Sequence, residues 1–170
     1  MRGGNGIGMI VADRRLGSGK LQRLTQDSSV ESSPCWSPDG REICYVSDAR
    51  GKPQLFRIPA SGGSPTPIMR SREETVSPDW SPVSNRVCFS RRMGGQYAIG
   101  VVDMATGKTE ILTRAAGDWE SPSWAPDGRQ IICSRRLGAV RSLYVIDSLL
   151  KTVRPVTQGG DHSLPNCGNP

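Results

Sequence analysis

Short apolar segments alternate with turn-forming residues along most of this chain. The strand expected at residues 42–46 is apolar on both sets of alternating positions, which predicts that both of its faces are covered. The segment before it ends in Ser37-Pro38-Asp39-Gly40, where proline presets φ, aspartate can bond the following backbone and glycine accepts a positive φ. This pattern predicts two antiparallel strands joined by a tight turn.

Two further apolar segments, residues 54–58 and 66–69, complete a unit of four expected strands. Pro67 falls in the fourth strand, and Pro155 occupies the corresponding place near the end of the chain. Because proline cannot donate to a β ladder, we expect the fourth strand at a sheet edge, with the strands ordered one to four from inside to outside. The 3.6-residue apolar period of helical repeats is absent.

The same unit recurs at a constant period. The tryptophans of its three copies, Trp36, Trp80 and Trp124, lie 44 residues apart twice over. A four-stranded antiparallel unit of this period is typical of a β-propeller blade. We expect each tryptophan to fill the wedge between neighbouring blades. The residues that define the repeat are Trp36, Pro38, Asp39, Gly40, Trp80, Pro82, Trp124, Pro126, Asp127 and Gly128.

The expected fold is therefore all-β: an open or truncated β-propeller of four-stranded antiparallel blades with a 44-residue repeat, about three and a half blades in all. The expected units are 1–25, the last two strands of a truncated blade; 26–69, 70–113 and 114–157, one blade each; and 158–170, an irregular tail. An open propeller leaves apolar faces and unpaired strand edges at both ends, so we expect self-association through them.

The repeat also resembles that of a known family. The sequence Trp-Ser-Pro-Asp-Gly-Arg at 36–41 is followed by alternating Ile, Tyr and Ser and by a glycine turn, and residues 99–107 and 121–129 have the same character. In these features residues 7–157 resemble the TolB family, the periplasmic propellers of the Tol–Pal system. The resemblance implies a periplasmic location, a role in envelope integrity and cell division, and a protein partner such as the lipoprotein Pal.

Composition limits the partners further. The formal charge is +6, but the basic residues are spread along the chain without a block of like charges, so nucleic acid is not an expected partner. No stretch approaches the roughly 20 apolar residues of a membrane-spanning helix. Residues 1–6 also lack the apolar run of a secretory signal. A peripheral association with the envelope would follow from the family resemblance alone.

Candidate chemistry is sparse. The five cysteines have no C-x-x-C spacing, which argues against a zinc site or a disulfide framework, and we expect most of them to be small buried side chains. The single histidine, His162, lies in the expected tail, so no Ser-His-Asp arrangement is expected in the repeats. Gly107-Lys108-Thr109 ends like a phosphate-binding loop, but Val102 stands where its first glycine belongs. We therefore expect no catalytic residue, no metal and no cofactor.

The turns after strands two and four share one end of an antiparallel blade, and here they include the longer segments, such as 114–120. Binding residues concentrate on loops held by a rigid scaffold, so this long-loop end is the expected partner surface. Its arginines repeat with the 44-residue period. The candidate partner-binding residues are Arg91, Arg92, Arg135, Arg136, Trp119, Glu73 and Glu120. The alternative is that these charges are solvated and pair with one another.

These features predict a non-catalytic, protein-binding propeller similar to TolB, with a Pal-like lipoprotein as partner. The alternative is a propeller fragment of a prolyl-oligopeptidase-like serine peptidase, whose catalytic domain would lie outside this sequence. The neighbouring coding region would separate the two, through either a Pal-like reading frame or a hydrolase segment containing Gly-x-Ser-x-Gly.

Overall fold

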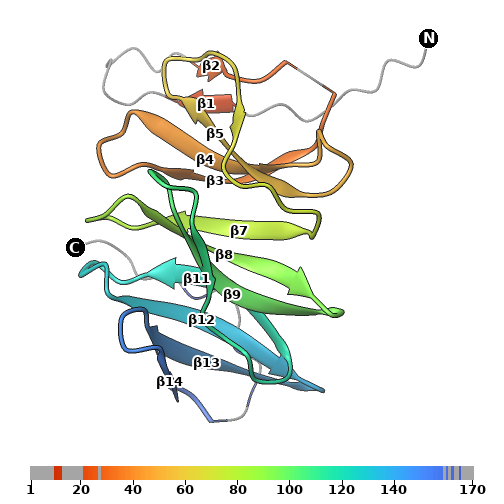
Figure 1. The fold of residues 1–170 in the computed structure, drawn as a ribbon, viewed down its shortest axis with the longest axis vertical. Coiled ribbons are helices and arrows are strands. Elements are labelled where there is room, and N and C mark those ends of the chain that lie inside the picture. Colours follow the sequence, from red (N-terminus) through yellow and green to blue (C-terminus); the bar gives the residue numbers. More distant parts are fainter. Residues whose placement is uncertain are drawn as a thin grey trace.

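The computed structural model describes residues 10–12, 21–26, 28–158, 160, 162 and 165, and the described residues form strands, turns and loops without a helix. A two-stranded pair is followed by three sheets of four antiparallel strands, one after another along the chain (Figure 1). This arrangement confirms the expected all-β fold built from open four-stranded blades.

We call the three sheets the first, second and third blades. The preceding pair consists of β1 (Ile10–Ala12) and β2 (Leu21–Arg23). The first blade contains β3 (Glu31–Trp36), β4 (Glu42–Ser47), β5 (Gln54–Pro59) and β6 (Thr66–Pro67). The second contains β7 (Thr75–Trp80), β8 (Arg86–Met93), β9 (Gln96–Asp103) and β10 (Thr109–Ile111). The third contains β11 (Asp118–Trp124), β12 (Gln130–Leu137), β13 (Val140–Asp147) and β14 (Thr152–Pro155).

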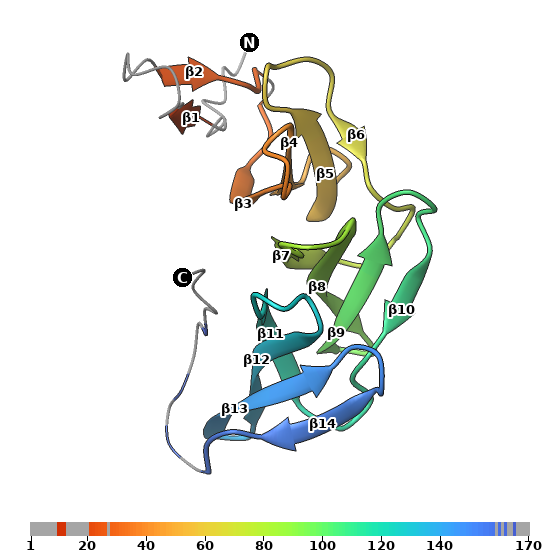
Figure 2. The same ribbon diagram turned by 90° about the vertical axis from the view of Figure 1, so that its left-hand side faces the viewer.

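The strands of each blade are hydrogen-bonded in sequence order, so the first and fourth strands are the sheet edges. Figure 2 shows the blades fanned in an open arc, with β3, β7 and β11 on its inner side and β6, β10 and β14 on the outside. The predicted order of strands is therefore confirmed. Pro67 and Pro155 lie in β6 and β14, at the outer edges where their missing N–H groups are tolerated.

In the first and third blades, the aspartate from which we predicted the turn between the first two strands also stabilises that turn. Asp39 Oδ1 accepts a hydrogen bond from the Arg41 N–H at 3.0 Å, and Asp127 Oδ1 makes the equivalent bond in the third blade. Gly128 has φ +64°, and a Cβ there would lie 2.1 Å from Cγ2 of Val83 in the second blade. Glycine thus provides both the backbone conformation and the space that lets neighbouring turns nest.

Much of the core lies between the blades. Between the first and second blades, Trp80 packs in a cluster with Val46 of β4 and Phe89 of β8. Trp124 takes the same place between the second and third blades, in a cluster that includes Ile131 of β12. Trp80 and Trp124 are only 6% and 2% exposed. Each of these tryptophans therefore fills a wedge between two sheets.

Trp36 departs from this pattern. It holds the same place in its repeat, but 49% of it is exposed. The described residues before β3 form β1 and β2, and Leu24 from the link after β2 covers part of the first blade in a cluster with Tyr45 and Ile58. Trp36 is not in this cluster, because among the described residues no inner strand of a preceding blade reaches it. The expectation that all three tryptophans fill an inter-blade wedge is wrong for Trp36.

Each inner strand also carries a bulge. The pairing register shifts between Ser32 and Cys35 in β3, and at the corresponding places in β7 and β11. The residues inside the bulges, Ser33, Ser77 and Ser121, have φ of 51°, 52° and 53°. Residues other than glycine rarely adopt this conformation. The sequence signal was the repeated Ser-Pro-x-Trp, in which proline interrupts the ladder just after the bulged serine.

The ends of the chain are described in part. The described residues of the expected segment 1–25 contain β1 and β2, whereas most of the expected tail, 158–170, lies outside the described residues. Where the structure is described, no helix has the length and apolar character needed to cross a membrane.

Candidate functional site

Two arginines extend from corresponding places at the long-loop end of adjacent blades. Arg92 near the end of β8 pairs with Glu74, with 3.8 Å between Nη1 and Oε2. Arg136 near the end of β12 pairs with Asp118, with 2.5 Å between Nη2 and Oδ2. Half of each arginine side chain is exposed, 50% for Arg92 and 49% for Arg136. The pairs are thus partly solvated, and each contributes little to stability.

Arg91 points away from Arg92, because successive strand residues face opposite sides of a sheet. Its guanidinium lies 4.9 Å from the centre of the Phe89 ring and donates to the sulfur of Met69. Burial lowers the pKa of Arg91, and the negative charge of Glu73 opposes that shift. Arg91 is therefore tucked between the first two blades and not displayed beside Arg92.

Arg135 is tucked in the same way. Its guanidinium lies 5.0 Å from the Trp119 ring and 5.7 Å from the Tyr144 ring. Its Nε and Nη2 donate to the carbonyl oxygen of Ala116 at 2.9 and 2.7 Å. The four arginines of the expected partner surface thus divide into two that are exposed, Arg92 and Arg136, and two that pack against aromatic side chains, Arg91 and Arg135.

Trp119 is not a surface anchor. It is 2% exposed, its Nε1 donates to the carbonyl oxygen of Ala115 at 2.9 Å, and its ring meets that of Tyr144 edge-on at 5.0 Å. The sequence placed it in a loop, but β11 begins at Asp118, so Trp119 is a strand residue that joins the core between the second and third blades. The expected role of Trp119 as a partner contact is therefore corrected.

The two glutamates of the expected site are placed differently from each other. Glu73 is exposed, and its carbonyl oxygen accepts from Gln54 Nε2 at 2.7 Å, which fixes the link between the first two blades. Glu120 lies in β11 and pairs with Arg141, with 3.4 Å between Oε2 and Nη2. Of the expected acidic residues, Glu73 therefore presents the freer carboxylate.

A hollow of about 370 Å³ lies on the inner side of the arc, lined by residues of β3, β7 and β11 that include the bulged serines. Asp79 contributes to it, and its Oδ2 accepts the Trp124 N–H at 2.7 Å. Burial raises the pKa of Asp79 above its usual range, against hydrogen bonds from Trp124 and Ser123 that lower it. This carboxyl group joins the inner strands of the second and third blades, a contact that the sequence did not reveal.

The cysteines that the structure describes are free. Burial raises the pKa of Cys133 to about 12 and holds the pKa values of Cys44 and Cys88 well above the usual thiol range. These thiols stay protonated at neutral pH and pack as small apolar side chains between the blades. Across the described residues, no three His, Cys, Asp or Glu side chains are grouped to hold a metal ion.

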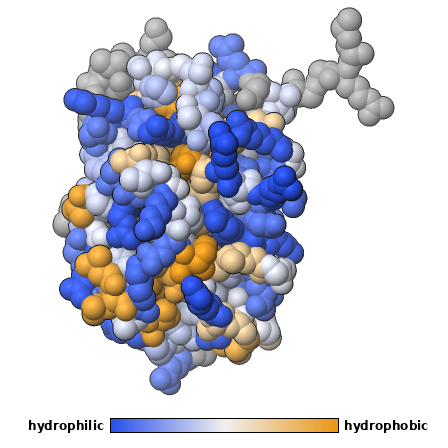
Figure 3. Space-filling view, viewed as in Figure 1, coloured by the Kyte–Doolittle hydropathy of each residue, from blue (hydrophilic) through white to orange (hydrophobic). Residues whose placement is uncertain are grey.

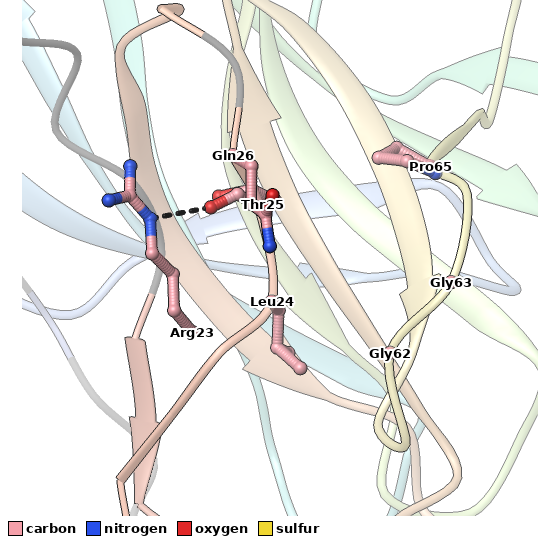
Figure 4. Close-up of a pocket in the computed structure, with 7 residues that line it drawn as sticks. All are labelled: Arg23, Leu24, Thr25, Gln26, Gly62, Gly63 and Pro65. Atoms are coloured by element: carbon pink, nitrogen blue, oxygen red, sulfur yellow. Dashed lines mark hydrogen bonds between the residues drawn. The ribbon is translucent and has the colours of Figure 1, made fainter.

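Another hollow, of about 360 Å³, lies where the link after β2 meets the β5–β6 turn (Figure 4). Arg23 is the charged residue of its lining, and its Nε donates to the carbonyl oxygen of Thr25 at 2.7 Å. Gly62 and Gly63 form the opposite wall with backbone in the positive-φ region. This lining offers no pair of titratable groups for acid–base chemistry.

Comparison with known proteins adds the family. The model of the TolB beta-propeller domain family matches residues 9–167. The Tol-Pal system protein TolB of Bordetella pertussis is 34% identical over 47 residues, which are 28% of this chain and 11% of that protein. The structure of TolB from Acinetobacter baumannii matches with a TM-score of 0.75 at 25% identity, over 89% of this chain and 38% of that chain.

The fold is also shared with other proteins. The structure of a puromycin hydrolase matches with a TM-score of 0.68 at 17% identity, over 84% of this chain and 23% of that one, and this likeness concerns the fold alone. The chain spans well under two thirds of each of these relatives. Because the family model covers most of the sequence, the resemblance inferred from the repeat is confirmed, and the chain belongs to the TolB beta-propeller domain family.

Proposed function

We propose that this chain is a protein-binding propeller of the Tol–Pal type, which acts in the periplasm, binds a Pal-like lipoprotein and carries no catalysis of its own. The observation that carries the proposal is the match of the TolB beta-propeller family to residues 9–167. Relatives such as the one from Bordetella pertussis are named as Tol-Pal system protein TolB. The described residues supply a rigid scaffold with charged groups at its long-loop end.

We assign the partner contact to Arg92 and Arg136. They occupy the same place in two adjacent blades, so their spacing is set by the stacked sheets. Both lie on strands, and each is aimed by its pairing with an acidic residue, Glu74 or Asp118. Acidic groups of a partner could compete for these half-exposed arginines without disturbing the core. Charges of this kind chiefly set the association rate and its salt dependence.

The test is a double substitution, Arg92→Glu with Arg136→Glu, in which association with Pal is measured at low salt. We expect association to slow by about ten-fold, because attractive charges at the rim become repulsive. The matched control is Arg129→Glu. Arg129 is also 49% exposed and paired, with Asp147 at 2.8 Å, but lies at the opposite, short-turn end of the third blade.

Circular dichroism of each variant checks that the blades remain folded. If the double variant associates with Pal as fast as the unmodified chain, Arg92 and Arg136 are not the partner contact. An unmodified chain that does not bind Pal at all would refute the proposed function itself.

A further inference from the structure

A basic hollow lies on the outer part of the first blade. It has a volume of about 460 Å³ and is formed where the β4–β5 hairpin meets the link from β6 to β7. Its cations are Arg50 and Lys52 from the hairpin and Arg70 and Arg72 from the link. A neighbouring hollow of about 570 Å³ shares Arg50 and Arg70, so the two form a continuous depression. The feature lies outside the Arg92–Arg136 contact proposed above.

The four cations have no acidic partner. In the described part of the chain none of them forms an ion pair, whereas Arg57, Arg129 and Arg136 all do. Arg50 instead contacts an aromatic ring of its own blade: its guanidinium lies 5.8 Å from the centre of the Phe56 ring. Four unpaired positive charges around one hollow repel one another, so the folded chain concentrates positive potential at this place.

The repeat shows that the blade does not need these charges. The same four positions are Gly94, Gln96, Arg114 and Ala116 in the second blade. They are Gly138, Val140, Gln158 and Gly160 in the third. The second and third blades form the same four-stranded sheet with one cation or none at these places. The cluster is thus a local addition to the first blade and not a requirement of its fold.

The acidic residues of the same two segments interact with groups other than the four cations. Asp48, on the hairpin, has its Oδ1 engaged by the Val30 N–H at 2.9 Å. The link carries two carboxylates: Glu74 pairs with Arg92 of the second blade, and the negative charge of Glu73 acts on Arg91. Three guanidinium groups and one ammonium group therefore line the hollow, and none of them forms an ion pair with these three carboxylates.

We propose that this basic hollow binds a phosphate group, carried by a small soluble molecule or by a lipid headgroup. A phosphate brings up to two negative charges and several acceptor oxygens into a small volume, and the planar fork of an arginine can bind two of them at once. The hollow is large enough to hold a phosphate with its attached group.

The test uses the full chain and two double variants that each remove two charges. Arg70→Gln with Arg72→Gln removes the two positive charges that the link contributes to the hollow. Arg114→Gln with Arg154→Gln is the control, because both residues are exposed and unpaired among the described residues and lie on other blades. Calorimetric titration with inorganic pyrophosphate measures the soluble arm. Co-sedimentation with vesicles of equimolar phosphatidylglycerol and phosphatidylcholine measures the lipid arm.

We expect the unmodified chain and the control to bind alike, and the Arg70→Gln, Arg72→Gln variant to bind at least about ten-fold more weakly, through loss of charge-assisted hydrogen bonds. A second variant, Arg50→Gln with Lys52→Gln, should weaken binding similarly from the hairpin side. Pyrophosphate binding without vesicle binding identifies a soluble ligand, and the reverse identifies a headgroup.

Three results would overturn the proposal. One is binding of neither probe. Another is equal weakening in the control and the hollow variants, which would reduce the effect to net charge. The third is binding of an oligoglutamate peptide in preference to both phosphate probes, which would make the hollow a contact for acidic protein segments.

Discussion

The first and third blades place the same tryptophan in opposite surroundings. Trp124, in the third blade, is 2% exposed, lies 5.4 Å from the guanidinium of Arg86, and donates its backbone N–H to Asp79, both in the second blade. Trp36, in the first blade, is 49% exposed. Since the two residues share their place in the repeat, the preceding blade and not the tryptophan's own sheet is what buries it. In this chain a blade is thus completed by the blade before it.

The largest expected effect tests this difference directly. Trp124→Ala should lower the free energy of unfolding by about 3–5 kcal/mol, since a large buried ring is lost from a packed interface. Trp36→Ala should change it by about 0.5 kcal/mol or less, as exposed substitutions do. Urea unfolding followed by circular dichroism measures both variants. Equal losses would show that the tryptophan is stabilised within its own sheet.

A second substitution sharpens the comparison at the same interface. Trp119→Ala should also cost about 3–5 kcal/mol, because the ring is buried against Tyr144 and stacked under Arg135. The same urea experiment applies, with Trp36→Ala as the exposed control. A loss close to that of Trp36→Ala would mean that the second and third blades hold together without this ring.

The smallest expected effect concerns the bond between the inner strands. Burial raises the pKa of Asp79, so the folded state holds its proton more tightly than the unfolded chain does. The stability that Asp79 contributes is therefore full below the ordinary carboxyl value of 3.8 and falls as pH rises through the raised folded pKa. Asp79→Asn does not titrate. Between acidic and neutral pH its free energy of unfolding should therefore rise, relative to that of the unmodified chain, by on the order of 1 kcal/mol.

The control for this pH series has the opposite sign. Hydrogen bonds from the Leu150 N–H and Arg129 lower the pKa of Asp147, so its contribution is present above the ordinary carboxyl value and is lost as pH falls. The free energy of unfolding of Asp147→Asn should therefore fall, relative to that of the unmodified chain, as pH rises. Parallel curves for the two variants would contradict the opposite surroundings assigned to Asp79 and Asp147.

The sequence predicted what is local and periodic. The Pro-Asp-Gly turn, the doubly apolar second strand and the edge proline Pro67 depend on neighbours within one unit, and the 44-residue spacing repeats them. The exposure of Trp36 could not be predicted in this way, because it depends on strands far away in sequence. Trp119 was assigned to a loop because the corresponding residues of the other two repeats are Glu31 and Thr75. These polar side chains do not indicate that a strand begins there.

The expected binding site was predicted less well for the same reason. The spacing of the arginine pairs correctly located them at one end of two blades, but strand alternation directs Arg91 and Arg135 between the sheets. The basic hollow was missed because its cations break the repeat, and each one looked like an ordinary loop charge. Only the folded hairpin and link bring Arg50 and Arg70 to one place.

The edges of the blades have a consequence for how this chain behaves when crowded with copies of itself. Three sheets have six edge strands, and five of them contain proline: Pro34 in β3, Pro67 in β6, Pro78 in β7, Pro122 in β11 and Pro155 in β14. The sixth, β10, holds Glu110 in an ion pair with Lys151 of the next blade. A fibril grows when an uninterrupted backbone edge templates the next strand, and proline or charge at the edge prevents that growth. Self-association of the open arc would therefore run through the apolar faces at its ends and not, as we also expected from the sequence, through its strand edges.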